Sequence, residues 1–378
     1  MTSIDTGPSI ETTGDGQHVP TVVIGAGQTG LATAYHLGSA GHDCLVVHAD
    51  ARVGDQWRQH RYESLRLNTP AQWDGLPGTP FPAPRGSFPT GAQMADYLES
   101  YVERHGIDVR HRTGVTRVER TDDGYVVTHR NGVIRADNVV VATGGEHHPR
   151  VPEVASQLDP GIRQLHSSDY RNPSQLLPGP VLVVGAGQSG ADLALEVVRA
   201  GHPTWLSGKV KGEIPIDIEG RRARVAGPVL WFIANHVLTL RTPIGRKAQP
   251  AIRAGGAPLL RVKRAHLDEA GVTRVESRTT AVSDGRPCLE DGTVLDVANV
   301  LWCTGFRQDF AFIHPSVTGP DGWPTDRGGV VPDSPGLYFM GLLFQRGFYS
   351  MLVGGAGRDA AYIARHIVRT SRTRVAAG

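Results

Sequence analysis

The chain has 378 residues, which is enough for two domains, each with its own hydrophobic core. Its formal net charge is +2, with 39% hydrophobic and 20% charged residues, so the composition gives no overall bias toward nucleic acid or membranes. The three cysteines, Cys44, Cys288 and Cys303, are far apart, which excludes a CxxC redox pair and a Cys-rich zinc site. We therefore expect no metal, and a reducing, cytoplasmic location rather than a disulfide framework.

The N-terminal residues 1–17 are polar and lack both a basic region and an apolar core. They predict a flexible tail and no signal peptide. No stretch of the chain approaches the roughly 18 apolar residues that span a bilayer, so we expect no stable membrane insertion.

Apolar runs alternate with helical patterns along the rest of the chain. Strands are predicted at Thr21–Ile24, Cys44–Val47, Val139–Ala142, Val181–Val184 and Val300–Cys303. Helical periodicity covers Gly91–His105 and Ala191–Ala200. This alternation predicts an α/β fold with parallel strands. Between residues 113 and 135, short strand-like runs separated by DDG and NG predict a small antiparallel meander.

Two segments carry the pattern GxGxxG between a predicted strand and a predicted helix: VVIGAGQTGLATAYHL and VLVVGAGQSGADLALEV. Their glycines are Gly25, Gly27, Gly30, Gly185, Gly187 and Gly190. The first glycine of each set allows a tight turn, the second lets a pyrophosphate approach, and the third lets the helix pack on the strand. The phosphate then meets the free N–H groups at the helix N-terminus. One copy is weak evidence, whereas two copies in the same context predict two dinucleotide sites.

The residues that follow the next strand distinguish the two sites. After the first loop this strand ends at His48 and Asp50 comes two residues later, so the ribose contact stays open. After the second loop, Ser207, Lys209 and Lys211 stand where an acid would bind an unphosphorylated ribose. A hydroxyl with two cations suits a 2′-phosphate, so we predict FAD in the first site and NADPH in the second. A solvated lysine loop is the alternative interpretation.

The domain arrangement follows from the order of these motifs. Pro-rich segments, EHHPRVPEV and RNPSQLLPGP, precede the second unit. We predict two Rossmann-like three-layer dinucleotide-binding domains, with the NADPH-binding domain inserted into the FAD-binding domain. The expected boundaries are 18–175 and 304–378 for the FAD-binding domain and 176–303 for the NADPH-binding domain.

Residues 209–264 form a segment that we call the basic segment. It holds twelve Lys or Arg residues but only three acids, and it includes the apolar run VLWFIANHVLTL. We expect it to pack within the NADPH-binding domain or in a subunit contact, and to bind neither lipid nor nucleic acid. Contact with a membrane surface is the alternative. The sequence leaves a homodimer open.

Further motifs lie outside the two loops. They are GDQWR at 54–58, YESLRLNTP at 62–70, VVVATGG, LWCTGF, and PGLYFMGLLFQRGFYS at 335–350. Together with the loops they resemble the class B flavin-containing monooxygenases, most of all the short bacterial members related to the plant YUCCA enzymes. The family signature FxGxxxHxxxY is matched in part by PGIRQLHSSDY, where His166 and Tyr170 agree but Pro160 and Ile162 replace Phe and Gly. Tyr170 stands where the Baeyer–Villiger version has Trp, which lowers the expectation of ketone-to-ester activity.

The resemblance implies an FAD- and NADPH-dependent monooxygenase that acts on a small-molecule substrate and O2. One oxygen atom would pass through a C4a-(hydro)peroxyflavin to sulfur, nitrogen or a carbonyl carbon. The resemblance implies catalytic roles for Asn68, His166 and Tyr170; a turn residue and a buried core histidine are the alternatives for the first two. The expected cofactor contacts, from the loops and the resemblance together, are Gly25, Gly27, Gln28, Thr29, Gly30, His48, Asp50, Gly54, Gln56, Trp57, Arg58, Leu67, Thr143, Gly185, Gly187, Gln188, Ser189, Gly190, Ser207, Lys209, Thr304, Gly305, Gln345 and Arg346.

Other functions compete with this one. A disulfide reductase needs a cysteine pair, which the scattered cysteines do not supply. A flavin oxidase or reductase that releases hydrogen peroxide stays open, as does a non-catalytic nucleotide-binding redox sensor. The sequence does not specify the substrate or the atom that is oxygenated.

Overall fold

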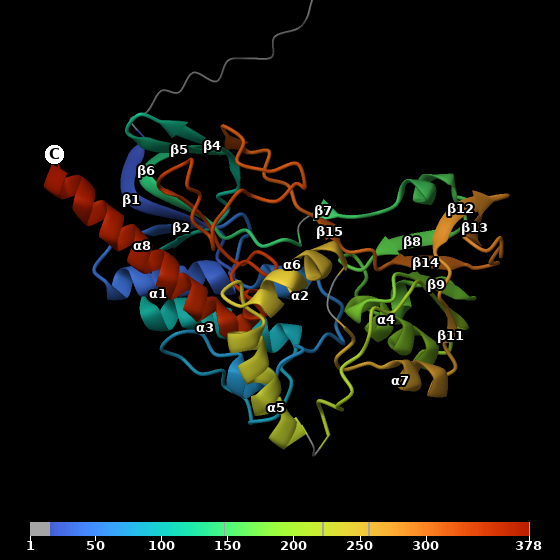
Figure 1. Ribbon diagram of the computed structural model, residues 1–378. Coiled ribbons are helices and arrows are strands. Elements are labelled where there is room, and N and C mark those ends of the chain that lie inside the picture. The colour runs from blue at the N-terminus through green and yellow to red at the C-terminus, as the bar shows by residue number, and fades with distance from the viewer. Residues whose placement is uncertain (1–15, 147, 221–222, 256–257, 378) are drawn as a thin grey trace, which may run out of the picture.

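The structure is a computed structural model that describes residues 16–146, 148–220, 223–255 and 258–377 (Figure 1). The strands are β1 (Gln17–Ile24), β2 (Leu45–Val47), β3 (Val109–Arg110), β4 (Val115–Thr121), β5 (Gly124–His129), β6 (Gly132–Val141), β7 (His148–Pro149), β8 (Arg163–His166), β9 (Val181–Val184), β10 (Thr204–Ser207), β11 (Thr273–Val275), β12 (Thr279–Ser283), β13 (Arg286–Leu289), β14 (Asn299–Trp302), β15 (Phe306–Arg307), β16 (Ile313–His314) and β17 (Leu337–Phe339). Of the predicted tail, residues 1–15 lie outside the described residues, and β1 already begins at Gln17.

The helices fall between these strands. The α-helices are α1 (Gln28–Ser39), α2 (Asp55–Gln59), α3 (Gly91–His105), α4 (Gln188–Arg199), α5 (Ala223–Phe232), α6 (Pro243–Gly255), α7 (Arg264–Glu269) and α8 (Ala356–Ala377). The 3-10 turns are η1 (Ala71–Trp73), η2 (Glu153–Gln157), η3 (Pro173–Gln175), η5 (Phe348–Met351) and η6 (Val353–Gly355), and η4 (Ile233–Val237) is a π-helix. No helix in the described ranges has the length and apolarity to cross a membrane.

The first sheet has the order β16-β4-β5-β6-β1-β2-β3, and β17 also pairs with β6. Its centre is parallel, while β4 and β5 form the predicted antiparallel meander with β6. Side chains alternate between its faces: Val23 and Val140 pack in the core beneath α1, α3 and α8, whereas Val22 and Val139 pack on the opposite side. Figure 1 shows these helices below the sheet and the meander above it.

The second sheet is parallel throughout, in the order β11-β10-β9-β14-β8. On one face Leu193 of α4 and Leu267 of α7 enter its core, and on the other Leu289 of the β12–β13 hairpin does so. Strands β16 and β17 of the first sheet follow β14 in the chain, so the second unit is inserted into the first. The predicted α/β fold with two Rossmann-like units, one inserted into the other, is confirmed. The pair β7–β15 lies between the units (Figure 1).

Two parts of the chain lie elsewhere than predicted. Strand β8 falls within the range assigned to the first domain but pairs with β14 of the second sheet, so the boundary at residue 176 comes too late for this strand. The middle of the basic segment packs on the first unit. Trp231 of α5 stacks on Trp73 with ring centroids 5.1 Å apart, and Gln249 of α6 donates to the carbonyl of Phe344 at 3.0 Å. The prediction that this part packs within the second unit is therefore wrong. That it binds neither lipid nor nucleic acid stays a prediction.

Candidate functional site

The first glycine loop joins β1 to α1, and its shape comes from the backbone. Gly25 has a φ of 109°, and a Cβ on it would lie 2.5 Å from the carbonyl oxygen of Ala142. A Cβ on Gly30 would lie 1.9 Å from the Gly25 carbonyl oxygen, so α1 packs directly against the turn. Nothing lies within 4 Å of a Cβ built on Gly27, which leaves open space above the N-terminus of α1. A pyrophosphate fits this space because the free N–H groups there attract anions.

The second loop, between β9 and α4, repeats this geometry. Gly185 has a φ of 106°, and a Cβ on it would lie 2.4 Å from the carbonyl oxygen of Cys303. A Cβ on Gly190 would lie 1.8 Å from the Gly185 carbonyl oxygen, and nothing lies within 4 Å of one on Gly187. The backbone of each loop thus fits a dinucleotide phosphate.

Both loops open onto one cavity of about 2090 Å³. Ligand pockets usually measure roughly 300–1,000 Å³, so this cavity has room for more than one ligand. The predicted cofactor residues on its wall are Gly25, Gly27, Gln28, Thr29, His48, Asp50, Gly54, Gln56, Trp57, Leu67, Thr143, Gly185, Gly187, Gln188, Ser189, Ser207, Lys209, Thr304 and Gly305. Gly30 and Gly190 lie behind the wall, where they allow the close helix packing described above.

The wall near the first loop carries an unpaired polar atom. Burial lowers the pKa of His48, with Asp50 acting against the shift, so the ring is neutral at pH 7. Its Nε2 atom is buried without a hydrogen-bond partner among the described residues, and it lies 3.6 Å from an Asp50 carboxylate oxygen. Buried polar atoms are normally paired, so this nitrogen is suited to contact a ligand.

The wall near the second loop is cationic. Lys209, Lys211 and Arg278 all line the cavity and are exposed. Ser207 departs from its predicted role, because its hydroxyl donates to the carbonyl of Ser277 at 3.0 Å and lies 2.9 Å from the Thr279 hydroxyl. That hydroxyl ties β10 to the chain before β12 and is not free to contact a phosphate. Arg278 replaces Ser207 as the third polar residue beside the two lysines. No sequence motif marks Arg278, because it lies between β11 and β12, far along the chain from the second loop.

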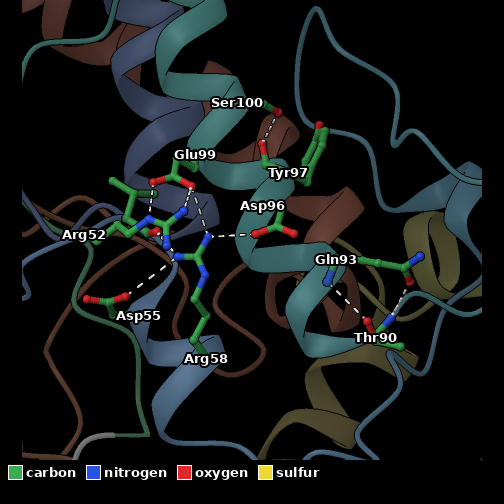
Figure 2. A network of polar contacts seen from close by, with 10 residues as sticks. Arg52, Asp55, Arg58, Thr90, Gln93, Asp96, Tyr97, Glu99 and Ser100 are labelled. Carbon is green, nitrogen blue, oxygen red and sulfur yellow. Dashed lines mark hydrogen bonds and ion pairs between the residues drawn. The ribbon is translucent and has the colours of Figure 1, made fainter.

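Arg58 also departs from its predicted role. Its guanidinium donates to Asp96 at 2.9 Å, to Glu99 at 3.1 Å and to the carbonyl of Val53 at 2.7 Å, and it does not line the cavity. Figure 2 shows Arg58 turned toward α3 in a network that includes Arg52. The motif GDQWR predicts a cofactor contact for Arg58, but the acids on α3 attract its side chain away from the cavity.

Asn68 lies on the cavity wall between Leu67 and Thr69. Within the described ranges no hydrogen bond holds its side-chain amide. The segment is fixed through its backbone instead: the Leu67 N–H donates to the carbonyl of Pro89 at 2.8 Å. A half-buried amide on a held segment is free to donate to a ligand, which fits the role expected of Asn68.

His166 and Tyr170 do not reach the cavity. Burial lowers the pKa of His166, and its neutral ring donates from Nε2 to the carbonyl of Gly305 at 3.1 Å while Nδ1 lies 2.9 Å from the Ser168 hydroxyl. It therefore braces the end of β8 against the chain leaving β14. Tyr170 is fully buried in the core beside α4, where burial raises its pKa. A direct catalytic role for either residue disagrees with this placement.

Gln345 and Arg346 point away from the cavity as well. The Gln345 amide donates to the carbonyl of Phe339 at 2.8 Å. Arg346 donates to Asp359 of α8 at 3.0 Å and lies over the ring of Tyr362. From the same C-terminal stretch, the residues that line the cavity are Gly341, Leu343, Ser350, Met351, Leu352 and Val353. The resemblance points to this stretch as part of the cofactor site, but not to which of its side chains face the cavity.

A buried carboxylate braces the two units against each other. Tyr62, from the segment that leads to Asn68, donates to Asp192 of α4 at 2.8 Å, and Arg261 donates to the same oxygen at 3.0 Å. Burial raises the pKa of Asp192 while Arg261 opposes the shift. The wall that carries Asn68 is thereby fixed relative to the second loop.

Comparisons with known proteins agree with this geometry. Models of the pyridine nucleotide-disulphide oxidoreductase family match residues 22–211 and 127–336. A CzcO-like uncharacterized oxidoreductase of Geobacillus kaustophilus is 35% identical, with 93% of this chain and 99% of the relative covered. A solved flavin-containing monooxygenase of Stenotrophomonas maltophilia is 26% identical, with a TM-score of 0.74 over 94% of this chain and 99% of that one. This chain belongs to the class B flavin monooxygenases. Arabidopsis thaliana has a 27% identical relative described as a probable indole-3-pyruvate monooxygenase, YUCCA1, with 92% of this chain and 89% of the relative covered.

As a member of this family, the chain is a flavin-dependent monooxygenase that uses FAD and NADPH. The two cradles fit both dinucleotides. Its cysteines, Cys44, Cys288 and Cys303, are all unpaired, so the disulfide chemistry in the name of the broader family has no cysteine pair here. In the described ranges, no group of three or more His, Cys, Asp or Glu side chains is placed to hold a metal ion.

Proposed function

We propose that this chain transfers one oxygen atom of O2 to a small nucleophilic substrate, at sulfur, nitrogen or a carbonyl carbon. The shared cavity carries this proposal: the space above Gly27 and the space above Gly187 open onto the same volume, with Asn68 on its wall. Hydride transfer between two cofactors requires such sharing, because reacting atoms must come to about 3–3.5 Å.

We assign FAD to the loop at Gly27 and NADPH to the loop at Gly187. When bound, the cofactors supply hydride transfer from NADPH and oxygen activation at FAD, with the C4a-(hydro)peroxyflavin as the proposed oxygen donor. His48 offers its unpaired nitrogen on the FAD side. On the NADPH side, Lys209 and Lys211 are placed to pair with a 2′-phosphate, which an NADH ribose lacks.

The residues around Asn68 would orient the reactants and keep water out. The Asn68 amide donates a hydrogen bond at the point where negative charge develops on oxygen. Leu67 beside it, and Met351 and Leu352 elsewhere on the wall of the same cavity, add apolar surface. An apolar wall strengthens the hydrogen bond and slows loss of the activated oxygen to water.

The domain limits follow from the sheets. We propose that residues 151–212 and 258–303 form the NADPH-binding domain. The FAD-binding domain then comprises the rest of the described chain, including α5 and α6. The helices of the basic segment thereby become part of the FAD side.

The test is a panel of a thioether, a tertiary amine, a cyclic ketone and a 2-oxo acid, the last chosen because of the indole-3-pyruvate relative. NADPH consumption, O2 uptake and hydrogen peroxide are measured together under ¹⁸O2. We expect one class of compound to lower the peroxide released per NADPH and to gain one ¹⁸O atom. Peroxide equal to NADPH with every compound would instead support the peroxide-releasing oxidase or reductase.

A further inference from the structure

Asp74 is a buried acid just behind the cavity wall. It follows η1, its side chain is inaccessible to solvent, and it does not itself line the cavity. One carboxyl oxygen, Oδ1, lies 2.5 Å from the hydroxyl of Thr69, which does line the cavity next to Asn68. The other oxygen, Oδ2, is buried without a hydrogen-bond partner among the described residues. Asp74 therefore has one polar connection, and that connection leads into the cavity.

The surroundings of Asp74 favour its neutral form. Burial raises its pKa to about 7, and the Thr69 hydroxyl acts against this shift. The titratable group that faces it is Tyr97 of α3, whose own pKa burial raises to about 12. The Tyr97 hydroxyl is already engaged, since it accepts from the Leu76 N–H at 2.6 Å and donates to the carbonyl of Thr79 at 2.7 Å. Asp74 is thus able to gain and lose a proton near neutral pH, whereas Tyr97 is not.

We propose that Asp74 and Thr69 form a proton relay into the cavity, in which Asp74 stores the proton and Thr69 delivers it beside Asn68. When Asp74 is ionised, the Thr69 hydroxyl donates to it. When Asp74 is protonated, the direction of the hydrogen bond reverses, and the Thr69 hydrogen is free to point into the cavity. In the delivery step the Asp74 O–H bond breaks as a new O–H bond forms on Thr69. The former Thr69 proton goes to the reacting group, and water later reprotonates the carboxylate.

The balance of the reaction requires such a proton. Each turnover consumes NADPH, O2 and one proton, and yields NADP⁺ with either water and oxygenated substrate or hydrogen peroxide. NADPH supplies both electrons, and the relay supplies the proton. Because peroxide release consumes the same proton, the relay is testable without a known substrate. The proposal rests on the flavin-dependent reduction of O2 in the proposed function, but not on the substrate.

Asp74→Asn in the holoenzyme is the first test. The variant keeps the shape and a hydrogen-bond acceptor but holds no exchangeable acid. NADPH consumption without substrate is expected to fall by about 100-fold at pH 6, the lower range for loss of a general acid, and to match the wild type at pH 9, where Asp74 is ionised. A merely structural role would lower the rate equally at every pH, and that result would overturn the relay. Asp326→Asn is the matched control, because Asp326 is also a largely buried acid with a raised pKa, but it accepts from the Gly329 N–H, which does not lead into the cavity.

A second measurement does not depend on activity. The pKa of Asp74 is raised from the ordinary value in the unfolded chain, so the native state binds the extra proton and stability falls as pH rises toward 7. The midpoint of thermal unfolding of Asp74→Asn should therefore rise relative to wild type between pH 5 and 8. Identical pH dependence in both proteins would show that Asp74 does not titrate there.

The Thr69 step has its own pair of variants. Thr69→Ser keeps the hydroxyl and should keep the pH dependence of NADPH consumption, whereas Thr69→Val should lose it. Equal behaviour of the two would contradict delivery through the hydroxyl, and this pair carries the test even if Asp74→Asn does not fold. The two proposals can fail separately. If Asp74 titrates and the variants of Asp74 and Thr69 behave as expected while no compound of the panel is oxygenated, the relay is supported and the proposed oxygen transfer is refuted.

Discussion

The two glycine loops have the same backbone but different side-chain surroundings. Gly25 and Gly185 share a left-handed conformation, with φ of 109° and 106°. In each, the turn is closed by the strand that carries the chain between the units: the Ala142 carbonyl after β6, or the Cys303 carbonyl after β14. Both loops leave open space above a helix N-terminus. Glycine spacing therefore specifies a phosphate cradle but does not specify which nucleotide fills it.

The side chains that follow the next strand make the difference. On the first side they are a neutral His48 and Asp50, and on the second side Lys209, Lys211 and the distant Arg278. A single cation contacting a phosphate contributes about 1.5–3 kcal/mol, which is enough to choose between NADPH and NADH. The backbone geometry of the phosphate cradle therefore occurs twice in this chain, whereas the charged side chains beside each cradle differ.

The largest effect is expected from filling the first cradle. Gly27→Leu places a side chain in space where no atom lies within 4 Å, so the protein should fold while the pyrophosphate is blocked. We expect a folded, colourless protein, measured by bound flavin absorbance and thermal unfolding. Gly38→Leu, in the helix that Gly27 caps and equally open but outside the cavity, is the control and should stay yellow. A fully yellow Gly27→Leu would refute the first cradle.

Asn68 lies on the wall that both cradles share, so its loss should spare both cofactors. Asn68→Ala should retain FAD and consume NADPH but release the oxygen as hydrogen peroxide. Losing one oriented donor typically costs about 2.7–4 kcal/mol, which corresponds to about 10²–10³-fold in oxygen transfer. The ratio of peroxide to NADPH, measured with a substrate from the panel, checks this. If the ratio of peroxide released to NADPH consumed is the same as in the wild type, Asn68 is only a turn residue.

Lys209→Ala tests whether the cations beside the second cradle select NADPH over NADH. The KM for NADPH should rise by about 10- to 150-fold, as expected for a lost charged contact to phosphate, while the KM for NADH stays nearly constant. Arg278→Ala should also raise the KM for NADPH relative to the KM for NADH. Steady-state kinetics with both nucleotides measures it. Equal losses with NADPH and NADH would show that Lys209 does not contact the 2′-phosphate.

The smallest effect is expected at Arg58, which the structure removes from the first site. Arg58→Met breaks partly exposed ion pairs with Asp96 and Glu99, and such pairs contribute about 0.2–1 kcal/mol. FAD content should stay at one per chain, with a slightly lower midpoint of thermal unfolding. Arg117→Met, which breaks an exposed pair with Glu119, is the control. Loss of flavin would restore Arg58 to the cofactor site.

Local signals allowed much of the fold to be predicted. Helix α3 spans Gly91–His105, as expected, because Thr90 caps its start and Gly106 adopts the left-handed conformation that ends it. Both glycine loops lie between a strand and a helix for the same reason: each depends on adjacent residues. The last of the predicted runs before residue 135 and the predicted strand Val139–Ala142 instead merge into β6, because its pairing with β1 continues across the polar residues between them.

Side-chain partners that are distant in sequence were the part that sequence patterns missed. Arg58 turns to Glu99, Arg346 turns to Asp359, and Trp231 stacks on Trp73 of the same unit. A motif indicates that an arginine lies near a cofactor segment but not which acid attracts it. Asp74 was missed for a different reason: its partner Thr69 is close in sequence, but no sequence pattern marks the burial that raises its pKa.

The central claim is that the two cradles hold different nucleotides, and Gly187→Leu tests it most directly. This variant fills the open space of the second loop and leaves the first intact. Under anaerobic conditions its flavin absorbance should be normal and should bleach with dithionite but not with NADPH. A Gly187→Leu protein that NADPH bleaches at the wild-type rate, or one that lacks flavin while remaining folded, would contradict the assignment of NADPH to the second cradle.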